Sequence, residues 1–332
     1  MPVNSRHLRA NLLLLAAAVM WGMAFTAQRV GAEHVGPLTF NAVRFAMGAA
    51  LISAVALFLD FRRGVSPRRR RQMRRDVMLP GLACGGLLTL ATGLQQIAIK
   101  DTTAGNAAFV TGLYLLLVPL FGLLVGHRIS WLTGAGIALA LGGLYLIAGT
   151  SSFSLTQGDG LVMVSAVCFA LQILAVDHWV NRLPALRFAA AQFWTCAIAS
   201  SIGGLIFDRQ PFGNLEAAAV PLAYGGLISV GLAYTFQVLG QRDAEPTPAA
   251  LIMASETVFG ALGGAIMLHE NMGLRGYGGA LAMTAGIVLS QLSRPASPAA
   301  HAATGSPPKV WGDPGGTEPP GPPRAGTGRP PR

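Results

Sequence analysis

The sequence predicts an all-α membrane protein with ten transmembrane helices, formed by two inverted five-helix repeats. Three observations carry this prediction. The 332 residues are 52% hydrophobic and only 11% charged, whereas about a quarter of the residues in a soluble domain are charged. The apolar residues fall into runs long enough to cross a bilayer, and the two halves of the chain resemble each other.

The apolar runs predict the helices one by one. A helix needs about 20 mostly apolar residues to cross roughly 30 Å of hydrocarbon. Runs of this kind, bounded by charge, proline or glycine, lie at 11–29, 37–59, 78–99, 103–125, 131–149, 160–180, 186–207, 217–240, 247–268 and 273–292. The stretch 294–332 is rich in proline and glycine and has little to bury, so we expect a disordered cytoplasmic tail there.

The first run has an alternative interpretation. Arg6, His7 and Arg9, followed by the apolar residues 12–18, are also typical of a secretory signal peptide. The run continues to Gln28 without a clear cleavage site, however, and it matches a later segment of the chain. A transmembrane helix is therefore favoured.

A weak internal repeat divides the chain into two halves. At a spacing of 148 residues, Met20-Trp21-Gly22 aligns with Cys168-Phe169-Ala170, and Arg44-Phe45 with Gln192-Phe193. At a spacing of 142, Gln95 aligns with Gln237, and Lys100-Asp101 with Arg242-Asp243. The predicted domains are 11–149 and 160–292, with five helices each. Because five is odd, the second half enters the membrane from the opposite side, as in an inverted-topology repeat.

Many secondary transporters have this architecture, since two equal halves of opposite orientation give two nearly isoenergetic states that open to either side. The sequence therefore predicts a transporter that works by alternating access between its halves. A membrane-embedded enzyme or scaffold without transport activity is the alternative. An enzyme predicts carboxylates or histidines clustered near one membrane face, and a scaffold predicts no polar cavity at mid-depth.

Arginine and lysine counts predict the orientation. With a cytoplasmic N-terminus, the inner segments hold 19 of these residues and the outer loops hold four. The positive-inside rule then places both termini of this multi-pass protein of the inner or plasma membrane in the cytoplasm. The basic loop that includes Arg68–Arg75 is mainly a topology signal and is also expected to contact anionic lipid head groups. Its charge lacks interleaved aromatics, so no nucleic-acid binding is predicted.

Two charged residues lie deep inside predicted helices, Arg44 and Glu256. A charge in hydrocarbon costs at least ~2.5–3 kcal/mol, so it normally faces a partner or a wet cavity. Helix geometry places their backbones roughly 6 Å apart in depth, which an arginine side chain spans. We expect that they pair or share a central cavity, with Arg44 binding a substrate carboxylate and Glu256 an amine or a coupling proton. A buried ion pair that only fixes helix packing is the alternative.

Polar and aromatic residues at helical spacing predict the lining of that cavity. Each alone is more often a contact between helices, but together they favour a site for a small amphipathic organic molecule. Besides Arg44, the predicted substrate-binding residues are Trp21, Gln28, Gln96, Asn106, Tyr114, Gln172, Tyr234 and Gln237. Pro119 interrupts the hydrogen bonds of its helix and marks either a gating bend or a static kink.

Motifs for catalysis, ATP hydrolysis and metal binding are missing. The sequence has no G-x-x-x-x-G-K-[ST] and no H-E-x-x-H pattern, and its six histidines and three cysteines are not clustered as ligands. We therefore predict no catalytic residue, metal or cofactor, and we expect that ATP does not drive transport from this chain. Homodimer formation is left open.

A signature in the second half resembles a known family. Residues 255–262, Ser-Glu-Thr-Val-Phe-Gly-Ala-Leu, followed by Leu-His-Glu at 268–270, are similar to the Ser-Leu-Glu-Pro-Val-Phe…Leu-Gly-Glu signature of the EamA-like family in the drug/metabolite transporter superfamily. The resemblance covers about 11–292. It implies ten helices in two inverted halves, both ends cytoplasmic, and carriage of small metabolites or drugs, often outward. We predict export of small metabolites, such as amino acids, or of amphipathic drugs. Thr257 and His269 depart from the signature, and the family does not choose one substrate.

Overall fold

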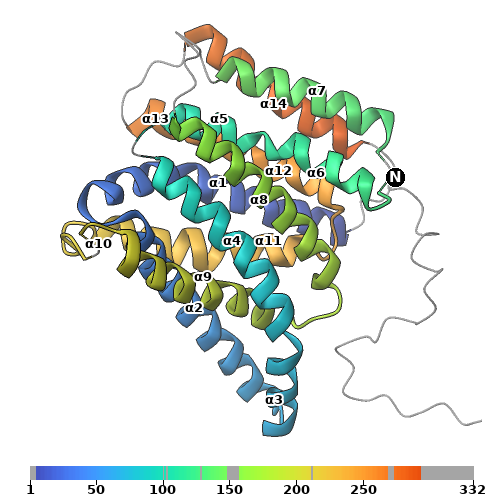
Figure 1. Ribbon diagram of the computed structural model, residues 1–332. Helices are drawn as coiled ribbons and strands as arrows, with labels where there is room; N and C mark the ends of the chain where they lie inside the picture. The colour runs from blue at the N-terminus through green and yellow to red at the C-terminus, as the bar shows by residue number, and fades with distance from the viewer. Residues whose placement is uncertain are drawn as a thin grey trace, which may run out of the picture. The chain divides into compact units, whose positions relative to one another are not determined.

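The computed structural model of the chain consists of helices (Figure 1). It describes the backbone of residues 5–99, 101, 104–127, 129–147, 157–210, 212–267 and 273–292, and the side chains of these except 104–106, 157 and 263–267. No strand occurs among the residues that it describes. The predicted disordered tail, 294–332, lies outside them.

The helices follow one another with short connections. They are α1 Ser5–His34, α2 Pro37–Arg62, α3 Pro67–Asp76, α4 Met78–Ala98, α5 Ala104–Gly112, α6 Tyr114–Leu124, α7 Trp131–Ile147, α8 Gln157–Val180, α9 Ala185–Phe207, α10 Ala219–Ala223, the π-helix η1 Tyr224–Tyr234, α11 Thr235–Gly240, α12 Pro246–Ala254, α13 Glu256–Met267 and α14 Gly273–Gln291. Within the described part, seven helical segments are long and apolar enough to cross a membrane. The remaining predicted spans correspond to α7, to α12 with α13, and to α14, and the count of ten stays a prediction.

Proline and glycine set several helix boundaries. Pro37, Pro67 and Pro246 each stand in the first turn of a helix, where the missing N–H has no partner to lose and the fixed φ suits the helix. Gly126 follows the end of α6 with a φ of 91°, a left-handed conformation that side chains disfavour. The residues at these helix ends therefore determine where the helices begin and end.

The arginine-rich segment, expected as a loop, contains a helix. Ser66 caps α3, because its Oγ accepts a hydrogen bond from the backbone N–H of Arg69 at 3.4 Å, and Pro67 opens the first turn. Near the other end, Gln72 Nε2 donates to Asp76 Oδ1 at 2.8 Å. Arginine is also among the better helix formers. Hydropathy alone did not reveal this helix because α3 is polar.

The exterior is apolar and the interior contains polar residues. Phe207 and Leu281 are 76% and 72% exposed, while Gln192 and Asn41 are fully buried. A soluble protein would reverse this distribution. The arrangement suits a chain surrounded by lipid, in which polar side chains face the bundle interior.

Helices of the first half of the chain and the helices aligned with them in the second half make similar contacts. Helices α2 and α9 pack together, as do α7 and α14, and each pair contains corresponding segments of the two halves. The contact of α4 with α8 has its counterpart in that of α1 with η1 and α11. Likewise α1 contacts α12 and α13, and α8 contacts α5 and α6. The same contacts thus recur when each helix is replaced by the one aligned with it in the sequence, and the organisation as two inverted repeats stays a prediction.

Backbones touch where α7 crosses α14. Gly136 lies against Gly286, and Gly143 lies against Gly279. A Cβ at Gly143 would collide with the backbone N of Met283 and the carbonyl oxygen of Gly279. Small residues at such a crossing let membrane helices approach closely and gain packing energy.

Two helical segments are interrupted at positions 142 residues apart. Leu113 separates α5 from α6, and Ser255 separates α12 from α13. The N–H of Leu113 donates to the carbonyl of Val110 at 3.2 Å, and that of Ser255 to the carbonyl of Ile252 at 3.1 Å. These i to i−3 bonds tighten each break in the manner of a 3₁₀ turn.

Candidate functional site

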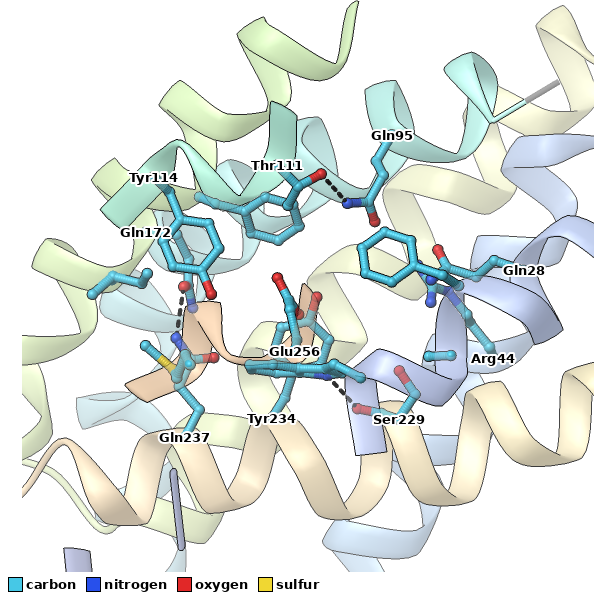
Figure 2. A pocket seen from close by; sticks show the side chains of 16 residues that line it. Gln28, Arg44, Gln95, Thr111, Tyr114, Gln172, Ser229, Tyr234, Gln237 and Glu256 are labelled. Atoms are coloured by element: carbon cyan, nitrogen blue, oxygen red, sulfur yellow. Dashed lines mark hydrogen bonds between the residues drawn. The ribbon is translucent and has the colours of Figure 1, made fainter. Parts of the chain in front are cut away.

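A cavity lies between helices from both halves of the chain (Figure 2). It is lined by 16 residues: Trp21, Ala24, Phe25, Gln28, Arg44, Gln95, Thr111, Tyr114, Phe169, Gln172, Ile173, Ser229, Tyr234, Gln237, Met253 and Glu256. Its volume is about 40 Å³, which is room for a few water molecules. An organic solute therefore needs the cavity to widen.

Twelve of the lining residues form six pairs with the spacings of the internal repeat. At 148 residues apart are Trp21 and Phe169, Ala24 and Gln172, and Phe25 and Ile173; at 142 apart are Gln95 and Gln237, Thr111 and Met253, and Tyr114 and Glu256. The four lining residues without such a partner in the lining are Gln28, Arg44, Ser229 and Tyr234. Corresponding positions of the two halves therefore face one cavity, with chemistry that differs between them.

Glu256 occupies the centre of the cavity. It is the first residue of α13, directly after the break at Ser255, and it is 6% exposed. The hydroxyl of Tyr114, which begins α6 after the equivalent break, faces the Glu256 side chain (Figure 2). The two interrupted helices thus place an acid and a phenol side by side.

Trp21 and Tyr234 line the same cavity as Glu256, and Figure 2 shows Tyr234 beside Glu256. Their ring centroids are 4.7 Å apart with a 59° angle between the planes. The indole Nε1 of Trp21 donates to the carbonyl oxygen of Ser229 at 3.2 Å, within the π-helix η1. π-Helical segments occur frequently at functional sites, and here η1 supplies two lining residues, Ser229 and Tyr234.

Arg44 lies at one end of the cavity, near Gln28 (Figure 2). Its Nε donates to Asn41 Oδ1 at 2.7 Å, and its Cζ lies 5.8 Å and 5.2 Å from the ring centroids of Phe40 and Phe45. Such distances allow cation–π attraction. No ion pair joins Arg44 to Glu256, so of the two expected arrangements the structure has them share a cavity.

Amide side chains occupy the opposite end. Gln237 Nε2 donates to Gln172 Oε1 at 3.1 Å, and Gln172 Nε2 donates to Gln192 Oε1 at 3.1 Å. Gln192 is the residue 148 positions after Arg44. The two ends therefore differ in charge, with a guanidinium at one and neutral amides at the other.

The structure brings most of the predicted site residues together. Trp21, Gln28, Arg44, Tyr114, Gln172, Tyr234, Gln237 and Glu256 all line the cavity. Gln96 does not line it, because its Nε2 donates to the backbone oxygen of Gln28 at 3.1 Å and so joins α4 to α1. Pro119 lies inside α6, away from the lining. The side chain of Asn106 is outside the described residues.

Several lining residues escaped sequence reasoning. Gln95 had a signal, since it aligns with Gln237 in the internal repeat, and the same spacing relates Thr111 to Met253 and Phe169 to Trp21. Asn41, which does not line the cavity but accepts a hydrogen bond from Arg44, had no signal beyond being a polar residue one turn before Arg44. Ser229 contributes through a π-helix, whose different periodicity removes it from any α-helical stripe.

Comparison with known proteins identifies the family. The model of the EamA-like transporter family matches residues 8–149 and, a second time, residues 156–292. The chain belongs to the EamA-like transporter family. This confirms the resemblance found in the sequence, and it makes the protein a membrane-spanning transporter.

Relatives of this EamA-like transporter have similar names. An uncharacterized transporter of Archaeoglobus fulgidus is 25% identical over 86% of this chain and 87% of its own. The uncharacterized transporter YoaV of Bacillus subtilis is 24% identical over 85% of this chain and 96% of its own. A protein of Streptantibioticus cattleyicolor named probable terminal-alkyne amino-acid exporter is 26% identical over 56% of this chain and 61% of its own.

A solved structure has the same fold. It superposes on this EamA-like transporter with a TM-score of 0.69, covering 85% of this chain and 96% of that chain at 20% identity. At this identity the likeness concerns the fold alone. The arrangement of helices that encloses the cavity is therefore also found in a protein of quite different sequence.

Proposed function

We propose that this protein is a secondary transporter that exports small metabolites, such as amino acids, or amphipathic drugs by alternating access at the cavity around Glu256. Its framework would be ten transmembrane helices in two inverted repeats, 11–149 and 160–292, with both termini in the cytoplasm. Family membership supports transport. The name of the Streptantibioticus relative supports amino acids as one substrate class.

The observation that carries the proposal is that most lining residues fall into pairs of corresponding positions, one from each half of the chain. Six pairs of positions, each separated by a repeat spacing, face the same cavity. A site placed between inverted halves is the arrangement from which rocking of one half against the other exposes a solute to either side. The exchangeable helix contacts and the equivalent breaks at Leu113 and Ser255 also support this mechanism.

The helix pair α2 and α9 supplies the proposed gates. Asp60, near the end of α2, forms an ion pair with Arg187 in the first turn of α9. Asp208, at the end of α9, accepts hydrogen bonds from the backbone N–H and the hydroxyl of Thr39 at 2.8 and 2.9 Å. Asp208 is 148 residues after Asp60, and Arg187 is 148 residues after Thr39, so the two contacts are equivalent. We call them the inner clasp and the outer clasp.

Both clasps are formed, and the cavity has a volume of only about 40 Å³. This combination suits an occluded conformation, from which opening one clasp at a time would give the two access states. With the orientation from the arginine and lysine counts, the inner clasp faces the cytoplasm and the outer clasp the other side.

Glu256 is the proposed coupling residue. Among the described residues that line the cavity it is the only acid, and a buried carboxylate is costly unless it is paired or takes up a proton. A proton that exchanges at Glu256 when solute leaves would couple solute export to proton entry.

Transport by purified protein in proteoliposomes tests the proposal. Vesicles loaded with a mixture of amino acids and amphipathic amines are given an imposed pH gradient, and the compounds that leave are identified by mass spectrometry. We expect pH-driven loss of some compounds, and Glu256→Gln is expected to abolish the pH dependence. Glu33→Gln, the same change at an exposed position of α1, is the matched control.

Two results would contradict parts of the proposal. If the protein moves none of these compounds faster than empty vesicles do, the transport of small metabolites and drugs is wrong. If Glu256→Gln keeps wild-type flux under the gradient, Glu256 has no coupling role. A size-exclusion profile of each variant shows that the protein is folded.

A further inference from the structure

The Arg44 end of the cavity contains a buried cation that no carboxylate of the described residues neutralises. Arg44 is 2% exposed. Among the residues that the structure describes, its buried Nη2 atom has no hydrogen-bond partner, and no carboxylate forms an ion pair with it. Guanidinium is a permanent cation with five N–H donors. A buried charge is normally paired and hydrogen-bonded, because its desolvation is otherwise uncompensated.

Asn41 fixes the direction of this guanidinium. Asn41 Nδ2 donates to the backbone oxygen of Thr92 on α4 at 2.9 Å, so its Oδ1 is the atom left to accept from Arg44 Nε at 2.7 Å. Asn41 is fully buried, and both of its partners lie on rigid helices. The amide therefore holds the guanidinium by one edge and leaves Nη2 available to another ligand.

The aromatic neighbours hold the cation without neutralising it. Phe40 and Phe45 lie within cation–π distance of Arg44 Cζ, and an aromatic ring attracts a cation but carries no net charge. The corresponding position in the second half is the neutral Gln192. Among the described lining residues, Arg44 is therefore the only cation.

We propose that Arg44, positioned by Asn41, binds the carboxylate of the solute, so that the solutes are small organic carboxylates with an apolar body. Planar guanidinium and planar carboxylate form paired, charge-assisted hydrogen bonds. The apolar body would lie against Trp21, Phe25 and Phe169 in the same lining. This proposal rests on the proposed function, because it names the substrate class of that cavity.

Matched pairs of compounds test the subsite in the purified full-length protein. Phenylalanine, leucine and phenylacetate are each compared with their primary amides, and binding is measured as protection of the protein against thermal unfolding over a concentration series. We expect at least one carboxylate to bind roughly 10- to 100-fold more tightly than its amide, as hydrogen bonds to charged groups do. Arg44→Gln should bring that ratio close to one.

Asn41 has its own variants. Asn41→Asp puts a carboxylate beside the guanidinium and should remove the preference for carboxylates by occupying Arg44. Asn41→Ala should lower the ratio by freeing the guanidinium to turn. A purely structural role of Asn41 would change thermal stability and leave the carboxylate-to-amide ratio unchanged. Asn214→Ala, the same type of change at an exposed position outside the cavity lining, should keep the ratio.

The outcomes separate this proposal from the transport proposal. The subsite is wrong if carboxylates and amides bind equally, or if none of the three carboxylates binds. It is also wrong if sodium chloride protects the protein against thermal unfolding as well as the carboxylates do, or if Asn41→Asp leaves the carboxylate-to-amide ratio unchanged. If the wild-type protein moves solutes without preferring carboxylates, transport stands and the subsite is wrong. If it binds carboxylates through Arg44 and moves none, the subsite stands and the proposed export of small metabolites and drugs is wrong.

Discussion

Asp60→Asn and Asp208→Asn are expected to shift the protein in opposite directions. The inner clasp joins Asp60 to Arg187, and the outer clasp joins Asp208 to Thr39. If opening one clasp at a time gives the two access states, weakening the inner clasp favours the state open to the cytoplasm. Weakening the outer clasp favours the state open to the opposite side.

The size of the shift follows from what each carboxylate contacts. Asp208 accepts two short hydrogen bonds, from the Thr39 N–H and hydroxyl at 2.8 and 2.9 Å, and a longer one from the Leu38 N–H at 3.4 Å. Hydrogen bonds to a charged group contribute about 1.5–3 kcal/mol each, and asparagine keeps an acceptor but loses the charge. We expect a loss of about 2 kcal/mol, or roughly 30-fold in the ratio of the two states at about 1.4 kcal/mol per tenfold.

The inner clasp should give a comparable effect. The side chains of Asp60 and Arg187 are each 14% exposed. Fully exposed ion pairs contribute only about 0.2–1 kcal/mol, whereas removing one partner of a buried pair costs about 3–5 kcal/mol. An intermediate loss near 2 kcal/mol is therefore expected for Asp60→Asn.

Accessibility of a reporter cysteine measures the shift. The three native cysteines are replaced, and Ala24→Cys places one thiol in the cavity lining. Membrane-impermeant maleimide is added to right-side-out and inside-out vesicles. Asp60→Asn should raise the labelling rate from the cytoplasmic side about tenfold or more, and Asp208→Asn that from the other side. Asp243→Asn, at an exposed position, should change neither rate.

Two outcomes would refute this reasoning. If both variants raise labelling from the same side, the two clasps do not lie at opposite faces of the membrane and the inverted relation of α2 and α9 is wrong. If neither variant changes labelling while both lower thermal stability, the clasps are static packing contacts. The comparison needs no knowledge of the solute.

Two further predictions concern other parts of the molecule. Gly143→Leu should destabilise the protein by about 1–3 kcal/mol through overpacking at α14, which is measured as a lower unfolding temperature. Gly142→Leu is the control, because an added Cβ there meets nothing. Equal effects of the two variants would contradict the close crossing of α7 and α14. Replacing Arg68, Arg69 and Arg71 by Gln should weaken the binding free energy of anionic lipid by about 1 kcal/mol per arginine. The amount of anionic lipid that stays on the purified protein measures this. Retention equal to that of Arg209→Gln would contradict lipid binding at α3.

Features that depend on local composition could be predicted from the sequence. Arg44 and Glu256 were identified because each interrupts an apolar run, and the structure places both in one cavity. A stripe of small and polar residues at intervals of three and four, Gly85, Thr89, Thr92 and Gln96, favours Gln96 over Gln95 as a lining residue. Adjacent residues on a helix point about 100° apart, and only packing decides which of two neighbouring glutamines faces a cavity. The repeat spacing, which pairs Gln95 with Gln237, was the better indicator.

Features that depend on tertiary contacts were beyond the sequence. Thr39 and Asp208 are 169 residues apart, and nothing in either segment indicates its partner until α2 packs on α9. By contrast, the helix α3 rests on local signals, the Ser66 cap and Pro67 in the first turn, which hydropathy alone does not detect. The break at Leu113 follows Gly112, but the break at Ser255 has no proline or glycine beside it, and the equal spacing of the two breaks shows only once the structure is known.

Corresponding positions of the two halves carry a charge in one half and a neutral polar group in the other, and this difference bears on how solute binding is coupled to the change of access. Arg44 corresponds to Gln192 and Glu256 to Tyr114, so each half contributes one charge where the other has a neutral polar group. Burying a charge at membrane depth costs at least ~2.5 kcal/mol. A solute that meets only Arg44 leaves Glu256 uncompensated until it takes up a proton, whereas a zwitterion that meets both removes both costs. We therefore expect the charge of the bound solute to decide whether a proton must accompany the return of the cavity from one side to the other.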